Sequence, residues 1–347
     1  MADVRVLVVD DSTTMRALFC GMFDDAKGVQ VLDHAASAAE AREIMTKMKL
    51  DVMTLDIEMP GMNGLEFLEE VMRERPMPVI MLSTLTQKGA DASIKAMELG
   101  AFDCFPKPTT ATRDEFDRIA PKLVALVKGA ANGKPTAKKK TAVEQAAGDD
   151  YRPGDRVVAL SASTGGVAAL MQILPAFPAH CPPTIIVLPL EPAMEESFIA
   201  RLDAACKPRI RRAMDGQKLE PGNVYLAVNK DNHVIVDRWP ETVLKLLPSD
   251  PVGGARPSAS LLFATLAKTA GARVVAGVLT GLGNDGAAGL MALKQAGAVT
   301  FAQDMDSAAA IEAPGAALAM GAAQRPVPLA DIASFVLSTC QEIARAA

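Results

Sequence analysis

The sequence lacks several features that would place the protein in a special class. It contains no apolar run of about 18 or more residues, the length that a membrane helix requires, so we expect no membrane insertion. Residues 1–5 lead directly into an expected strand without a signal-peptide pattern, which favours a cytoplasmic protein. The five cysteines include no C-x-x-C pair, which argues against a zinc site or a disulfide framework. A net charge of −5 gives no general attraction to nucleic acid, and we expect no nucleic-acid partner.

The length of 347 residues suggests about two domains. Residues 129–153 are rich in glycine, alanine, proline and lysine and lack apolar periodicity, so we interpret them as a flexible linker. The three lysines at 138–140 are interpreted as part of this solvated spacer. The sequence therefore predicts an N-terminal domain at 1–128 and a C-terminal domain at 154–347.

The N-terminal domain alternates expected strands with expected helices. The strands are 5–9, 29–34, 52–55, 79–82 and 102–105, and the helices between and after them include 38–48, 64–74, 88–99 and 112–128. This rhythm predicts an α/β fold with a doubly wound parallel sheet. Polar side chains follow four of the five strands: Asp10 and Asp11, then Asp56, then Ser83 and Thr84, then Lys107.

These polar residues should meet, because the carboxyl ends of parallel strands lie at one edge of a sheet. Three carboxylates with waters and phosphate oxygens form a set that suits Mg²⁺. Asp56 could then accept a phosphoryl group whose charge the cation and Lys107 would neutralise, with a hydroxyl bonded to one of its oxygens. Taken singly, Asp56 could instead cap a nearby turn, and Lys107 could be a surface cation.

Residues 1 to about 128 resemble a response-regulator receiver domain, which has a flavodoxin-like fold. The segments VVDDS, LDIEMPGMNG, ST after the fourth strand and PKP match that family's pattern. The resemblance implies Asp56 as phosphoacceptor, Mg²⁺ held by Asp10, Asp11 and Asp56, and a histidine kinase as partner. It also implies that Ser83, Thr84 and Lys107 contact the phosphoryl group. One position departs from the pattern, because Cys104 stands where receivers commonly carry an aromatic switch residue.

The C-terminal domain contains two turns that carry candidate catalytic residues. An expected strand at 156–160 leads into SASTGG and a helix, which would place Ser163 beside unpaired backbone N–H groups, as in a nucleophile elbow. The alternative is a helix cap followed by glycines for packing. An expected strand at 273–279 leads into TGLGNDG, where Asp285 could orient a catalytic partner or cap its own helix.

The remaining expected elements complete an α/β domain with a β-hairpin addition. Residues 223–228, 234–236 and 243–247 are expected to form short antiparallel strands. Helices are expected from about 255 to 267, from 287 to 296 and from 332 to 343.

Residues 156 to about 345 resemble the catalytic domain of the CheB family of chemotaxis methylesterases. The segments SASTGG, PGNVYLA, ARPS and LTGLGNDGAAGL match its motifs. The resemblance implies Ser163 as the nucleophile and Asp285 as the residue that supports a catalytic histidine. It also implies methyl-accepting chemoreceptors as partners, with glutamyl methyl esters or glutamines as substrates, and a receiver that covers Ser163 until it is phosphorylated.

The catalytic histidine of that family is missing from this sequence. Alignment of Ser197-Phe198 with the family pattern puts Pro189 at the histidine position, and Ala255 replaces a second histidine of the HRPS-type motif. Proline cannot accept or return the serine proton. Of the three histidines, only His180 is considered as a stand-in, since His34 belongs to the first domain and His233 to the hairpin region. We therefore expect either a weak esterase or deamidase, or a phosphorylation-gated binding module that retains the esterase shape.

Overall fold

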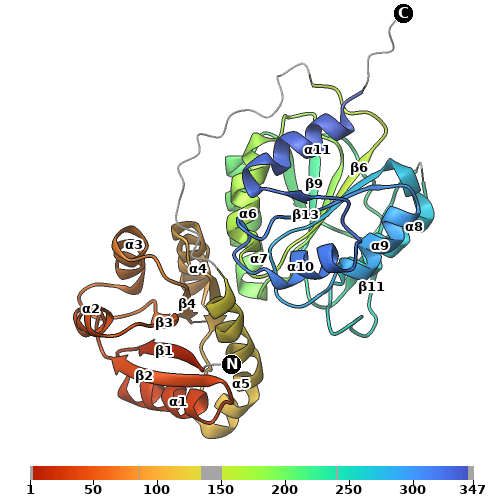
Figure 1. The fold of residues 1–347 in the computed structure, drawn as a ribbon. Coiled ribbons are helices and arrows are strands. Elements are labelled where there is room, and N and C mark those ends of the chain that lie inside the picture. The colour runs from red at the N-terminus through yellow and green to blue at the C-terminus, as the bar shows by residue number, and fades with distance from the viewer. Residues whose placement is uncertain (1–2, 85, 134–150, 240, 343–347) are drawn as a thin grey trace, which may run out of the picture. The chain divides into compact units, whose positions relative to one another are not determined.

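The structure, a computed structural model, describes residues 3–84, 86–133, 151–239 and 241–342. These residues form two compact units, one up to residue 133 and one from residue 151 (Figure 1). Among the described residues, no helix is both long enough and apolar enough to span a membrane.

The N-terminal unit is a five-stranded parallel sheet with helices on both faces. The sheet order is β2-β1-β3-β4-β5, with strands β1 (Val4–Val9), β2 (Val29–Ala35), β3 (Val52–Asp56), β4 (Val79–Ser83) and β5 (Asp103–Pro106). One face is covered by α1 (Thr13–Asp24) and α5 (Arg113–Asn132), and the other by α2 (Ala38–Lys47), α3 (Gly64–Glu74) and α4 (Gln87–Leu99) (Figure 1). This order confirms the predicted doubly wound, flavodoxin-like fold.

Local sequence explains how the chain leaves β3 and begins α3. Asn63 accepts a hydrogen bond from Glu66 N, while the Glu66 side chain accepts one from Asn63 N, so the helix starts with a capping box. A Cβ added at Gly64 would lie 2.0 Å from Asp56 O. Only glycine therefore allows α3 to begin this close to the end of β3. The turn fixes Asp56 at the edge of the sheet.

The C-terminal unit is built on a seven-stranded parallel sheet of order β14-β13-β12-β6-β7-β9-β8. Its strands are β6 (Val157–Ser161), β7 (Thr184–Val187), β8 (Arg209–Arg212), β9 (Asn223–Ala227), β12 (Val274–Val278), β13 (Val299–Gln303) and β14 (Pro326–Val327). Helices α6 (Gly166–Ile173), α7 (Pro192–Ala205) and α11 (Ile332–Cys340) lie on one side of the sheet, and α8 (Ala259–Thr269), α9 (Ala287–Gln295) and α10 (Glu312–Ala319) lie on the other (Figure 1). Short 3₁₀ turns occur at Leu174–Ala176, Gly271–Arg273 and Leu329–Asp331.

A small antiparallel hairpin, β10 (His233–Val236) with β11 (Leu244–Leu247), packs against α8. It is the predicted β-hairpin addition. The prediction that residues 223–228 belong to this hairpin was wrong, because β9 pairs in parallel with both β7 and β8 inside the main sheet. All five residues of β9 are buried, as expected for a strand covered on both faces.

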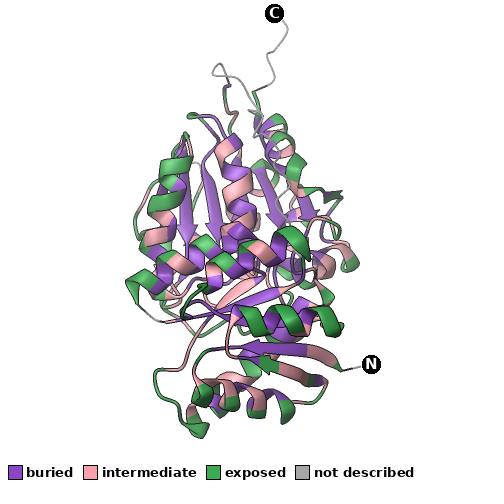
Figure 2. Cartoon of the chain, turned by 90° about the vertical axis from the view of Figure 1, so that its left-hand side faces the viewer, coloured by how far each residue is buried: buried purple, intermediate pink, exposed green. Residues whose placement is uncertain are grey.

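Burial follows the layers in both units. The strands of the two parallel sheets are mostly buried, whereas the helices alternate buried and exposed faces (Figure 2). Near the crossing of α1 and α5, Phe19 packs edge-to-face on Phe116 with ring centroids 4.8 Å apart.

The predicted linker of 129–153 was too long at both ends. Helix α5 continues through Asn132, and Tyr151 is already buried in the C-terminal unit with its hydroxyl donating to Leu337 O at 3.0 Å. Pro153 forms an isolated bridge with Gln341. Residues 134–150, which include the three lysines, lie outside the described residues.

Candidate functional site

Each unit carries its candidate site where the strand order changes direction. In the N-terminal unit β1 lies beside β3, and in the C-terminal unit β6 lies beside β12. The helices after such neighbouring strands leave on opposite faces, which opens a position for ligands at the carboxyl ends of the strands. Asp10 and Asp56 mark this position in the first unit, and Ser163 and Asp285 mark it in the second.

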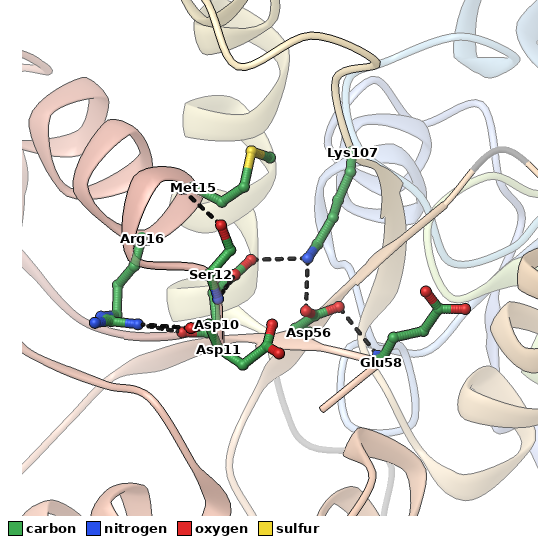
Figure 3. Close-up of polar contacts among 8 residues, drawn as sticks. All are labelled: Asp10, Asp11, Ser12, Met15, Arg16, Asp56, Glu58 and Lys107. Carbon is green, nitrogen blue, oxygen red and sulfur yellow. Dashed lines mark hydrogen bonds and ion pairs between the residues drawn. The ribbon is translucent and has the colours of Figure 1, made fainter. Parts of the chain in front are cut away.

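The predicted acidic residues and the lysine of the first unit come together. Lys107 Nζ lies 2.6 Å from Asp56 Oδ2 and 2.8 Å from Asp10 Oδ2 (Figure 3). The second oxygens are held by backbone amides, since Asp10 Oδ1 accepts from Ser12 N at 2.9 Å and Asp56 Oδ1 accepts from Glu58 N at 3.1 Å. The two buried carboxylates thus share one ammonium group.

Asp10, Asp11 and Asp56 form a cluster that fits a divalent cation. Carboxylate oxygens of the three residues lie within 4.8 Å of one another, and Asp11 is exposed while the other two are buried. Hard oxygen donors with one solvent-facing member suit Mg²⁺, which retains several waters when it binds proteins. The residues present therefore fit the predicted metal.

Burial dominates the electrostatics of this cluster. Burial of Asp56 raises the pKa of its carboxyl to about 6, although the contact with Lys107 opposes this change; nearby Asp10 adds to it. Burial alone would lower the pKa of Lys107, but the neighbouring Asp56 and Asp10 carboxylates outweigh burial and raise it. Lys107 therefore stays charged.

The hydroxyls at the end of β4 contact other partners in this structure. Ser93 of α4 donates to Ser83 Oγ at 2.9 Å, and Thr84 Oγ1 lies 3.2 Å from Thr86 Oγ1. The Cys104 thiol, at the position where an aromatic was expected, donates to Ser93 O at 3.3 Å. Burial raises the pKa of Cys104, so the thiol remains neutral. Ser93, which was not predicted, therefore connects Ser83 to Cys104.

Ser163 is half-buried at the turn between β6 and α6. Its Oγ accepts a hydrogen bond from Leu282 N at 3.2 Å, and its own backbone N donates to Thr280 O at 3.1 Å. A Cβ added at Gly281 would lie 2.4 Å from Ser163 Oγ, so glycine is required where the loop after β12 approaches the serine. Among the described residues, no side chain accepts a hydrogen bond from the Ser163 hydroxyl.

Asp285 caps a helix, but that helix is not its own. Its Oδ1 accepts from Ser258 Oγ at 2.9 Å and from Ser260 N at 3.0 Å, and its Oδ2 accepts from Ala259 N at 2.7 Å. All three donors lie at the start of α8. In return Gly286 N donates to Ser260 Oγ at 2.8 Å, so the first turns of α8 and α9 hold each other.

Pro189 lies at the edge of the sheet that carries Ser163. Ser161 pairs with Val187 across β6 and β7. Ser163 lies two residues after Ser161, and Pro189 lies two residues after Val187. Residue 189 therefore emerges at the same edge of the sheet as Ser163. Proline supplies no titratable group there, and Ala255 supplies none in the loop before α8.

No histidine of the C-terminal unit is placed to serve Ser163. His180 precedes β7 and therefore lies at the amino-end edge of the parallel sheet, opposite the serine, so its consideration as a stand-in was wrong. His233 is fully buried; its Nδ1 accepts from Ser258 N at 3.1 Å, and its Nε2 lies 3.0 Å from Asp250 O. Both ring nitrogens of His233 are thus occupied by backbone groups.

Comparisons with known proteins agree with this two-unit organisation. The family model described as "CheB methylesterase" matches residues 158–336, and the one described as "Response regulator receiver domain" matches residues 6–115. A protein-glutamate methylesterase/protein-glutamine glutaminase of Agrobacterium fabrum is 44% identical over 96% of this chain and 95% of that protein. One from Caulobacter vibrioides is 43% identical over 97% of this chain and 98% of that protein. The solved Thermotoga maritima CheB methylesterase catalytic domain matches with a TM-score of 0.51 and 27% identity, covering 53% of this chain and 98% of that domain.

We expect the stability of the N-terminal unit to fall as the pH rises from about 4 to about 7. The folded pKa of Asp56, about 6, exceeds its unfolded value of about 4, so its contribution is complete below pH ~4 and is lost as the pH rises through about 6. The loss should reach about 1–3 kcal/mol. Calorimetry is the suitable measurement, because Trp239 and both tyrosines lie in the other unit.

The matched variant for this measurement is Asp56→Asn, which has the same size and no titrating group. It should show a flatter pH dependence and should be the more stable protein at pH 8. Equal slopes for the two proteins would contradict the assignment of the raised pKa to Asp56.

We also expect Asp285→Asn to destabilise the C-terminal unit by about 1–3 kcal/mol, because a charged acceptor of three hydrogen bonds at a helix start is lost. Urea unfolding followed by Trp239 fluorescence would measure the change. Asp331→Asn is the control, because Asp331 precedes α11 without a side-chain capping bond and should change stability by less than about 0.5 kcal/mol. Equal effects of the two substitutions would show that the Asp285 bonds contribute little.

Proposed function

Because this chain belongs to the CheB methylesterase family and carries that family's receiver domain, we propose that it is a chemotaxis-type regulator with a weak or inactive esterase site. Asp56 would accept a phosphoryl group from a histidine kinase, and the effector domain would engage methyl-accepting chemoreceptors. The relatives are named protein-glutamate methylesterase/protein-glutamine glutaminase. The observation that carries the proposal of weak turnover is a proline at position 189, at the sheet edge where Ser163 also emerges.

In the receiver, an Asp56 oxygen would attack the phosphorus of a phosphohistidine. The P–N bond breaks and the imidazole leaves, while the new acyl phosphate retains the negative charge. With a pKa of about 6, Asp56 is mostly ionised and nucleophilic at neutral pH. Lys107 contacts Asp56 Oδ2 and Asp10 Oδ2, and its ammonium group can neutralise the negative charge of the transferred phosphoryl oxygens.

Magnesium is proposed as the receiver's cofactor, with Asp10, Asp11 and Asp56 as its protein ligands. When bound, the cation neutralises negative charge on the phosphoryl group. Asp10 and Asp56 are held in place for this role by the amides of Ser12 and Glu58, so their oxygens need no rearrangement. Ser83 Oγ accepts from Ser93, so its own hydroxyl proton remains available to donate to a phosphoryl oxygen.

In the effector, Ser163 would have to attack an ester or amide carbonyl without a base. The Leu282 amide that donates to Ser163 Oγ supports an anion near the serine, but it cannot remove the hydroxyl proton. Loss of a triad histidine typically lowers turnover by about a million-fold, with about 10³- to 10⁴-fold catalysis over water left. The unit therefore supports recognition of the receptor better than hydrolysis of it.

The second candidate function is a competent methylesterase or glutamine deamidase. Its support is the full-length similarity to relatives with those names. It requires a base that replaces the histidine, and no described side chain of the C-terminal unit accepts a hydrogen bond from Ser163.

Incubation of the full chain with acetyl phosphate and Mg²⁺ should add one phosphoryl group to Asp56. Intact-mass analysis should show the modified species in the unaltered chain and not in Asp56→Ala. Asp11→Asn should reduce the rate because one proposed metal ligand is weakened. If Asp56→Ala is modified to the same extent, the phosphoacceptor lies elsewhere.

Methanol release from methylated receptor membranes should be at or near the background for the phosphorylated chain. Pro189→His should raise it by at least an order of magnitude, because the imidazole would be delivered beside Ser163. The double variant with Ser163→Ala should lose this gain. Robust release by the unaltered chain that disappears in Ser163→Ala would instead favour the competent esterase.

A further inference from the structure

Glu312 places a carboxylate next to the Ser163 turn. It is the first residue of α10, and its Oε2 accepts a hydrogen bond from Gly283 N at 2.8 Å. The preceding amide, Leu282 N, is the one that donates to Ser163 Oγ at 3.2 Å. The carboxylate and the serine hydroxyl are therefore held by successive amides of one loop. No local sequence motif marks Glu312.

This carboxylate forms no ion pair with any described residue. Its residue, Glu312, is exposed to solvent. The stretch 304–324, which leads into and through α10, contains three acidic residues and no lysine or arginine. Position at a helix start explains why the carboxylate is tolerated. It does not neutralise the negative potential that Glu312 adds beside Ser163.

We propose that Glu312 makes the Ser163 site selective for uncharged glutamyl side chains, the methyl ester or the amide, over ionised glutamate. This inference rests on the proposed function as a receptor-binding module. A ligand carbonyl placed against Ser163 would lie near the Glu312 carboxylate, because Ser163 and Glu312 accept from the successive amides of Leu282 and Gly283. At the effective dielectric constants of protein surfaces, repulsion between two such carboxylates corresponds to about a tenfold difference in affinity.

The same charge opposes hydrolysis. Attack by Ser163 would build negative charge on the ligand oxygen, next to the negative charge of Glu312. The described contacts also place Glu312 on the Gly283 amide and include no hydrogen bond from Ser163 to it, so the geometry favours selection of the ligand over removal of the serine proton. The module would thus read the modification state of a receptor glutamate without changing it.

Co-sedimentation of the full chain, activated with beryllofluoride, with receptor membranes tests this inference. The probes are two preparations of one receptor whose methylation positions are all glutamine or all glutamate. The unaltered chain should bind the glutamine form about tenfold more tightly. Glu312→Gln should reduce the preference to less than about twofold, mainly by tighter binding to the glutamate form.

Glu220→Gln is the matched control, because Glu220 is exposed and precedes β9 at the opposite edge of the sheet; it should retain the preference. Equal binding of both membranes by the unaltered chain, or an unchanged preference in Glu312→Gln, would overturn the inference while the binding function stands. Binding to neither membrane would overturn the proposed function and the inference with it. Methanol release that Glu312→Gln abolishes would make Glu312 a base and refute its role as a selector.

Discussion

The register of neighbouring parallel strands determines what both units can do. Because β6 and β7 pair Ser161 with Val187, residues two positions farther along each strand emerge together at one edge of the sheet. The pairing of β3 with β4 places Asp56 opposite Leu82, one residue before Ser83. The strands themselves are almost wholly apolar and buried, so polar chemistry is confined to their ends. A slip of one residue in either sheet would send these side chains to the wrong face.

The buried charges of the Asp10–Asp56–Lys107 cluster lower the stability of the N-terminal unit. Two buried carboxylates share one lysine, and burial of Asp56, with a smaller contribution from the neighbouring Asp10 charge, raises the pKa of its carboxyl. A cation or a transferred phosphoryl group with its metal would relieve this imbalance, so the folded protein is built for a ligand that it must acquire. Sites of this kind exchange some stability for binding.

The sequence predicted most of the receiver because each functional residue directly follows a strand with a clear apolar pattern. Asp10, Asp56 and Lys107 could be assigned to one edge without knowledge of any contact between distant segments. The sequence was misleading for β9, because a short apolar strand has the same sequence pattern in a hairpin as in a buried parallel sheet. Strand β8 was missed because its sequence, RIRR, has the charged residues of an edge strand instead of an apolar run. The partners of Asp285 and Glu312 depend on loop positions that no local pattern encodes.

The double linkage between the starts of α8 and α9 bears on how motifs in this family should be interpreted. Asp285 sits in the segment GNDG, which matches a catalytic motif, yet it accepts hydrogen bonds from Ser258, Ala259 and Ser260 without any histidine. Selection for folding alone would preserve such an aspartate long after a lineage had stopped hydrolysing esters. Retention of this aspartate is therefore a poor marker of turnover, and residue 189, two positions beyond the end of β7, is the more informative one.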